Sequence, residues 1–208
     1  MLLGFVFLIV VTFLFFSIAS RTPDPIVVLE DDELEALTEP VVTVIDPVQG
    51  SKEASVTIVE FGDFACGPCA KLDTTLAQLY AMYPDDVRIV WKDAPNESLH
   101  PESLSAAIAA RCADEQDLFW AYHNELFLRQ NSLGTTTYLS IAEDLALDED
   151  AFASCLENQD PLPRIQKTLE EAEALSLTAT PTIFIGSERF VGAVEFDEIR
   201  ERILAELR

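Results

Sequence analysis

The sequence has few basic side chains. Lysine and arginine together number 13, against 37 aspartates and glutamates, so the formal net charge is −24 at pH 7. Such an acidic chain repels phosphate backbones and anionic lipid headgroups, which argues against nucleic acids and anionic membrane surfaces as partners. The charge identifies no substrate by itself, because a solvated acidic surface is enough to explain it.

Histidine and cysteine are also scarce, with two and four copies. Cys66 and Cys69 form a CxxC pair, but the second CxxC that a zinc ribbon needs is missing. We therefore expect no metal site and no cofactor. The sequence contains no internal repeat and no low-complexity tract, and its apolar content of 49% argues against disorder.

Charged residues are absent from Met1 to Ser20. As a helix rising about 1.5 Å per residue, this apolar segment would span roughly 30 Å of hydrocarbon. It is longer than the roughly 7–15 residue core of a cleaved signal peptide, so we favour an uncleaved anchor, with a cleaved signal as the alternative. Either reading puts the domain outside the cytoplasm, where disulfides persist.

The next part of the chain predicts a linker and a β-α-β unit. Residues 21–45 form an acidic, proline-containing linker that ends in a first strand, Val41 to Ile45. Turn residues follow at 46–50, and then come a strand, a helix and a strand within 56–91. Two strands joined through a helix favour parallel pairing with a right-handed crossover.

The second half begins with helical periodicity. Residues 100–175 predict five helices, and residues 176–208 predict a β-hairpin followed by an amphipathic helix. The chain therefore predicts an α/β sheet interrupted by a helical block, with the strands on both sides of the block forming one sheet.

The CxxC pair lies where the strand that begins at Val56 gives way to a helix. Unpaired N–H groups and the helix dipole favour a negative charge at that position, so the Cys66 thiolate is stabilised. Pro68 is tolerated there because an N–H in the first helical turn has no partner in any case. We expect Cys66 to be exposed and nucleophilic, and Cys69 to be buried and resolving. A purely structural disulfide between the two is the alternative.

These features together resemble the DsbA-like thiol-disulfide oxidoreductases of the thioredoxin superfamily. The resemblance rests on EFGDFACGPC, on Thr180-Pro181-Thr182 and on the helical block, and covers roughly residues 46–208. It implies an α/β, thioredoxin-like fold with an inserted helical domain. Residues 46–99 would form its first half, 100–175 the insertion, and 176–208 its second half.

The resemblance also implies roles for four residues outside the CxxC pair. Pro181 would be cis and lie against the cysteines, leaving the Thr180 backbone free to pair with a substrate peptide; an ordinary proline at a strand start is the alternative. Glu60 would be a buried acid that relays protons to and from Cys69 through water, unless it points to solvent. Lys92 would pair with Glu60, or else be an exposed lysine without a role.

The other two cysteines lie on separate predicted helices of the insertion. With the CxxC pair taken, an oxidising compartment leaves the pairing Cys112–Cys155, and some members of the family staple the insertion in this way. Two free, buried cysteines are the alternative. We expect His100 to mark the start of a helix and His123 to contribute packing or surface rather than catalysis.

The resulting hypothesis is an extracytoplasmic enzyme that exchanges disulfides with exported, cysteine-containing proteins through a redox-active Cys66–Cys69 pair. A DsbA-like oxidase is favoured, with a membrane redox partner of the DsbB or VKOR kind. Gly67-Pro68 departs from the proline-histidine pair of strong oxidases, so a reductase or isomerase served by a transmembrane thiol donor remains open. A non-catalytic chaperone or adaptor on the same fold is the other alternative.

Overall fold

The computed structural model describes residues 37–208. The predicted anchor and most of the acidic linker lie outside these residues. Within 37–208, no helix combines the length and apolar character required to cross a membrane.

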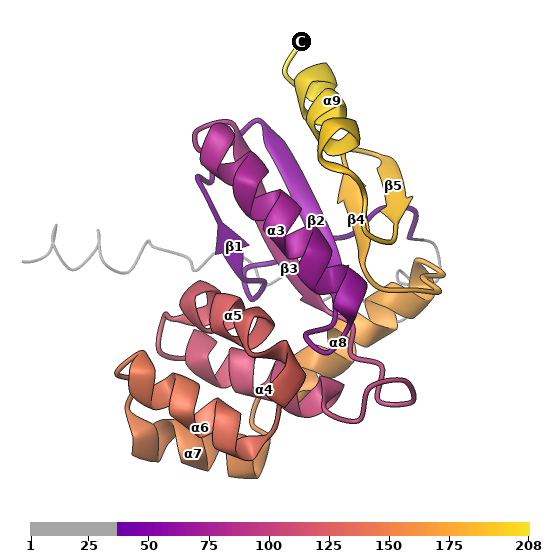
Figure 1. The fold of residues 1–208 in the computed structure, drawn as a ribbon. Helices are drawn as coiled ribbons and strands as arrows, with labels where there is room; N and C mark the ends of the chain where they lie inside the picture. The colour runs from indigo at the N-terminus through magenta and orange to yellow at the C-terminus, as the bar shows by residue number, and fades with distance from the viewer. Residues whose placement is uncertain (1–36) are drawn as a thin grey trace, which may run out of the picture.

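A five-stranded sheet forms the centre of the molecule (Figure 1). Its strands lie in the order β1-β3-β2-β4-β5; β2 and β3 are paired parallel, and the other three neighbouring pairs are antiparallel. The strands are β1 (Val48–Gln49), β2 (Val56–Gly62), β3 (Val87–Asp93), β4 (Thr182–Ile185) and β5 (Glu188–Val191). The sheet thus unites strands from before and after the helical block, as the sequence predicts.

Alternating side chains of the central strands supply two separate cores. Ile58 and Ile183 belong to the core on one face, which also contains residues of α3 (Gly67–Met82) and α9 (Phe196–Glu206). Phe61 and Phe184 belong to the core on the other face, which includes Ala172 of α8 (Leu162–Ala174). Because neighbouring residues of a strand point to opposite faces, the same strands contribute side chains to both cores.

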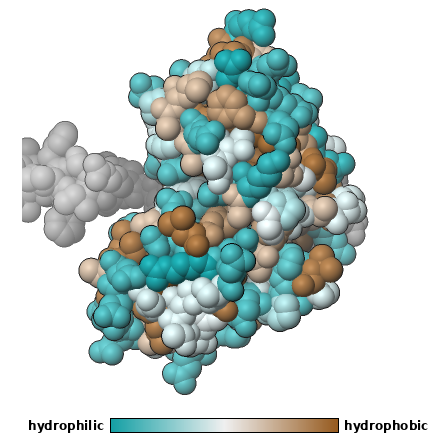
Figure 2. All heavy atoms as spheres, viewed as in Figure 1, coloured by the Kyte–Doolittle hydropathy of each residue, from teal (hydrophilic) through white to brown (hydrophobic). Residues whose placement is uncertain are grey.

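The helical insertion lies between β3 and β4 and contains all five predicted helices. They are α4 (Ser103–Asp114), α5 (Phe119–Leu128), α6 (Thr135–Asp144), α7 (Glu149–Asn158) and α8 (Leu162–Ala174), with a short 3-10 turn, η1 (Gln130–Ser132). In Figure 1, α4 to α7 form a lobe beside one end of the sheet. On the face drawn in Figure 2, hydrophilic side chains cover both lobes and hydrophobic ones form small separate groups.

A disulfide joins Cys112 of α4 to Cys155 of α7, as predicted. The Cα atoms are 5.8 Å apart, and the two residues are 43 positions apart in the sequence. Closing a loop of this length restricts the unfolded chain and stabilises the fold by about 4 kcal/mol in the chain-entropy account.

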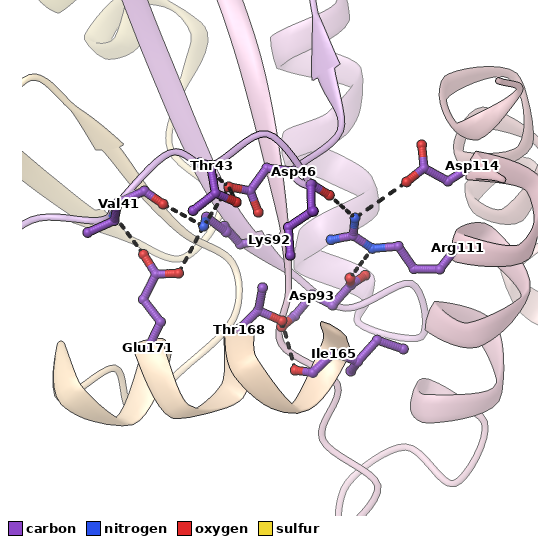
Figure 3. A network of polar contacts seen from close by, with 11 residues as sticks. Val41, Thr43, Asp46, Lys92, Asp93, Arg111, Asp114, Ile165, Thr168 and Glu171 are labelled. Atoms are coloured by element: carbon purple, nitrogen blue, oxygen red, sulfur yellow. Dashed lines mark hydrogen bonds and ion pairs between the residues drawn. The ribbon is translucent and has the colours of Figure 1, made fainter. Parts of the chain in front are cut away.

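The strand predicted over 41–45 is wrong, and the first strand, β1, lies where a turn was expected. The Asp46 carboxylate accepts hydrogen bonds from the backbone N–H and the hydroxyl of Thr43, at 2.7 and 2.9 Å, which bends the segment. Val41 donates its N–H to Glu171 of α8 at 2.7 Å instead of to a strand (Figure 3). Side chains therefore satisfy the backbone groups that a strand partner would otherwise satisfy.

Candidate active site

A buried carboxylate shapes the loop that leads from β2 to the cysteines. Asp63 accepts hydrogen bonds from the Ala65 N–H at 2.8 Å and from the Ser103 hydroxyl at 2.6 Å, and its backbone carbonyl accepts from the Cys66 N–H at 3.1 Å. His100 Nδ1 lies 2.9 Å from the same carboxylate. These contacts join the loop to the start of the insertion, so the position of Cys66 depends on both parts of the fold.

Cys66 is the N-cap of α3, where its sulfur accepts a hydrogen bond from the Cys69 N–H at 3.3 Å. A hydrogen bond with the Cys69 side chain lowers the pKa of Cys66 most, and bonds with Thr180 and the Cys69 backbone add to it, so the pKa falls from 9.0 to about 6 despite burial. A thiolate at this position is therefore the main form of Cys66 near neutral pH.

The expected exposure of Cys66 is wrong. The residue is only 3% exposed, because the loop before β4 lies against it and its sulfur is 3.5 Å from the Thr180 carbonyl oxygen. Cys69 is fully buried, as predicted, and burial raises the pKa of its thiol above the ordinary value. The two cysteines are free thiols here and differ sharply in acidity, which suits one to attack and the other to resolve.

The peptide bond between Thr180 and Pro181 is cis, as the family resemblance implies. Pro181 immediately precedes β4, and its carbonyl accepts a hydrogen bond from the Gly192 N–H at 2.7 Å, which ties the loop to the end of β5. The contact between Thr180 and Cys66 places this loop directly against the reactive sulfur.

Glu60 is buried at 2% exposure, so the prediction of a buried acid is confirmed. Burial raises its pKa well above the ordinary value, and the negative charges of Asp73 and Cys66 raise it further. Glu60 in turn raises the pKa of Cys69 through its charge, so the two groups are electrostatically linked. Its role as a proton relay stays a prediction.

The predicted pairing of Lys92 with Glu60 is wrong. Lys92 Nζ lies 2.8 Å from Asp46 and 2.9 Å from Glu171, and it donates to the Val41 carbonyl at 2.7 Å (Figure 3). Glu60 is the register partner of Trp91, the neighbour of Lys92, so the two side chains leave the sheet on opposite faces. Lys92 therefore anchors the segment before β1 and takes no part in the cysteine site.

Two residues that the sequence did not single out, Asp63 and Gln130, also shape the site. Gln130 donates its amide N–H groups to the carbonyls of Phe64 and Cys66, at 2.7 and 3.0 Å, and so bridges the insertion to the cysteine loop. Asp63 precedes Cys66 by three residues, a position that could have suggested it, whereas nothing in the sequence marks Gln130. His123 is buried among aromatic rings, as the packing prediction required.

The chain matches one known protein family and several solved structures. The family model described as Thioredoxin matches residues 43–205. The chain belongs to this family. Among solved structures it is similar to the catalytic domain of Proteus mirabilis ScsC, with 26% identity and a TM-score of 0.67 over 78% of this chain and 89% of that one. BdbD from Bacillus subtilis has 23% identity and a TM-score of 0.70, over 78% of this chain and 93% of that one, and shares the fold.

A third structure of the same fold is the thiol-disulfide exchange protein α-DsbA2 from Wolbachia pipientis, with 24% identity and a TM-score of 0.68 over 79% of this chain and 88% of that one. The fold of this thioredoxin-family chain is thus DsbA-like.

The curated relatives that match this thioredoxin-family chain are named as Na(+)/H(+) antiporters. It is 34% identical over 160 residues to "Na(+)/H(+) antiporter NhaA 3" of Salinispora tropica, covering 77% of this chain and 24% of that protein. It is 31% identical over 199 residues to the NhaA antiporter of Herminiimonas arsenicoxydans, covering 93% of this chain and 30% of that protein. The chain spans about a quarter of the length of the first curated relatives it matches.

Proposed function

We propose that this chain is a thiol-disulfide oxidoreductase acting on exported, cysteine-containing proteins. One observation carries the proposal: Cys66 is held as an acidic thiol at the start of α3, beside a buried Cys69 of much lower acidity. A structural disulfide does not require the two thiols to differ in pKa. Disulfide exchange does, because the thiolate is the attacking species and the better leaving group.

In the oxidase direction, a substrate thiolate attacks Cys66 of the Cys66–Cys69 disulfide. The bond between the two enzyme sulfurs breaks, a mixed disulfide forms at Cys66, and Cys69 leaves with the electron pair and takes up a proton, which Glu60 supplies. A second substrate thiolate then attacks the substrate sulfur of the mixed disulfide. Cys66 leaves as a stabilised thiolate, and the substrate leaves oxidised with the enzyme pair reduced.

The substrate peptide is proposed to approach beside Thr180. This residue precedes Pro181 and contacts the Cys66 sulfur, so a cysteine-containing peptide that reaches Cys66 meets the Thr180 backbone. Strand-like pairing with that backbone would hold peptides of different sequence, since main-chain hydrogen bonds do not depend on side chains.

We further propose that the N-terminal segment anchors the domain at the outer face of a membrane. Its charge-free sequence supports this placement, and so does the Cys112–Cys155 disulfide, because disulfides persist in oxidising compartments. Reoxidation would then come from a membrane partner of the DsbB or VKOR kind. A reductase or isomerase is the second candidate, favoured by the Gly67-Pro68 pair.

Trapping experiments test the enzymatic proposal. Replacing Cys69 with alanine should leave mixed disulfides at Cys66 unresolved, so that substrate adducts accumulate and vanish on reduction. Replacing Cys66 with serine should abolish both adducts and turnover of a dithiol peptide. A chaperone or adaptor would bind unfolded proteins equally well in both variants, and that result would overturn the proposal.

The direction of exchange is decided by the reduction potential of the Cys66–Cys69 pair against glutathione. Potentials in this superfamily run from about −270 mV for thioredoxin to about −120 mV for DsbA. A value towards the DsbA end supports the oxidase, whereas a value at the thioredoxin end supports the reductase.

A further inference from the structure

A small cavity lies between the sheet, α3 and α5, on the same face of the sheet as Glu60. It has a volume of about 70 Å³. Its polar lining consists of Gln49, Glu60, Asp73, Tyr80, Trp120, His123 and Asn124. No lysine or arginine lines it among the described residues, so no cation neutralises its two carboxylates.

Three polar atoms at this cavity are buried without a hydrogen-bond partner among residues 37–208: Glu60 Oε1, Trp120 Nε1 and His123 Nε2. Unpartnered buried polar atoms are rare in native proteins, because each one costs free energy unless water satisfies it. A polar cavity of this size accommodates water, and water in such a site makes about three hydrogen bonds.

The hydrogen-bonding roles of the three atoms are complementary. His123 Nδ1 lies 3.2 Å from the Asn124 side-chain oxygen and 3.7 Å from Asp73 Oδ1, both acceptors, which assigns the proton of the neutral ring to Nδ1. His123 Nε2 is then an acceptor, and Glu60 Oε1 also accepts, either as a carboxylate oxygen or as the carbonyl oxygen of the neutral acid, while Trp120 Nε1 is a donor. One water can donate to the two acceptors and accept from the indole.

Asp73 connects this buried group to solvent. Its side chain is 24% exposed, whereas the side chain of His123 is 1% exposed. Burial raises the pKa of Asp73 from 3.8 to about 6, and burial lowers the pKa of His123 to about 4. Near neutral pH the Asp73 carboxylate is therefore poised to take up and release a proton, while the histidine stays neutral and orients the water.

We propose that this cavity holds water that passes the Cys69 proton from Glu60 to Asp73 and on to solvent. The inference rests on the proposed function and deepens it. When Cys69 attacks a mixed disulfide at Cys66, its S–H bond breaks and Glu60 takes the proton. The new sulfur–sulfur bond forms as the partner leaves as a thiolate, and Glu60 then loses its proton through the cavity water to Asp73. In the oxidase direction the proton runs inward along the same route.

Mixing reduced protein with glutathione disulfide separates the relevant steps. Acid quenching and mass measurement count the Cys66–glutathione adduct as it forms and as Cys69 resolves it. Asp73→Asn keeps the shape of the side chain and should slow resolution roughly tenfold, a smaller loss than the roughly 100-fold or more typical for a direct general acid or base. Formation of the adduct should change less than twofold. His123→Phe, which keeps an aromatic ring for packing, should slow resolution severalfold.

Three controls separate proton transfer from a merely electrostatic or structural effect. Asp85→Asn removes an exposed carboxylate just beyond the same helix and should leave both steps unchanged. Added acetate, at constant pH and ionic strength, should restore resolution in Asp73→Asn but not accelerate the wild-type protein. Asp73→Asn combined with Glu60→Gln should be no slower than Glu60→Gln alone, since both residues act in series.

The outcomes separate this inference from the proposed function. If Glu60→Gln slows resolution while Asp73→Asn matches the wild type at every pH, the route through Asp73 is wrong and the oxidoreductase stands. A slow Asp73→Asn that acetate does not rescue also overturns the route. If the wild-type Cys66 never forms an adduct with glutathione, the proposed function itself fails.

Discussion

Glu60 and Lys92 lie on opposite faces of the sheet, although each belongs to one of two hydrogen-bonded neighbouring strands. Glu60 pairs in register with Trp91, which places Lys92 beside Phe61 and on the face that α8 covers. Among residues 37–208, Glu60 therefore has no cationic partner, and no nearby positive charge offsets the rise in its pKa that burial causes. Lys92 instead joins two carboxylates that come from distant parts of the chain.

Replacing Lys92 with methionine should strongly destabilise the fold. The substitution leaves the buried carboxylates of Asp46 and Glu171 without their cation, and breaking a buried ion pair typically costs about 3–5 kcal/mol. Chemical denaturation measures the loss. Lys167→Met, which removes an exposed cation from α8, should change stability by less than about 0.5 kcal/mol. A shift in the pKa of Glu60 in Lys92→Met would contradict the separation of the two side chains.

Glu60→Gln should stabilise the protein at alkaline pH. The folded-state pKa of Glu60 is raised, so between its unfolded and folded pKa values the native state holds more protons than the unfolded state. Stability from this group is present at low pH and is lost as pH rises towards the folded pKa. The melting temperature of the variant relative to the wild type should thus increase with pH, by roughly 2–4 °C per kcal/mol regained. An equal difference at pH 5 and pH 8 would argue against a buried, neutral Glu60.

The thiol of Cys66 should ionise with a midpoint about three pH units below that of an ordinary cysteine, near pH 6 against 9.0. The hydrogen bond with the Cys69 side chain contributes most to this shift, so Cys69→Ala should raise the midpoint. Thiolate absorbance and the pH dependence of iodoacetamide alkylation both report it. As a control, Thr75→Ala should leave the midpoint unchanged, because the Thr75 hydroxyl donates to the Lys71 carbonyl within α3. Alkylation of wild-type Cys66 with an ordinary midpoint would be incompatible with the proposed role.

Removing the Cys112–Cys155 disulfide should lower stability without abolishing exchange. Replacing both cysteines with alanine frees the unfolded chain of the loop constraint, which should lower the free energy of unfolding by about 4 kcal/mol. The disulfide joins α4 to α7 within the insertion, whereas Cys66 and Cys69 belong to the start of α3. We expect a lower denaturation midpoint together with a Cys66 pKa within experimental error of the wild type. A changed pKa would show that the staple also positions the active site.

Much of this site could be predicted from local sequence because its chemistry is local. Cys66 caps the helix that its own neighbours form, and the spacing of Cys69 puts the second sulfur in the first turn of that helix. The burial of Glu60 and the cis bond at Pro181 followed from the family resemblance. The burial of Cys66 could not be predicted from the local sequence, since the loop that covers it contains Thr180, 114 residues later in the chain.

The errors have one source in common. The segment 41–45 has strand-forming residues, yet Asp46 bends it and Glu171 captures the Val41 N–H, so distant side chains override local propensity. Lys92 is misassigned for the same reason, because its two carboxylate partners lie 46 and 79 residues away.

The sequence by itself determined the elements and the reactive pair: hydrophobic periodicity set the helices and strands, and CxxC at a strand-to-helix junction set the thiol chemistry. Only the tertiary structure decided which faces the charged side chains occupy and which distant groups meet them. The cavity beside Glu60 arises where the sheet, α3 and α5 pack together. Strand register and helix packing are long-range properties, and the chain around each residue does not specify them.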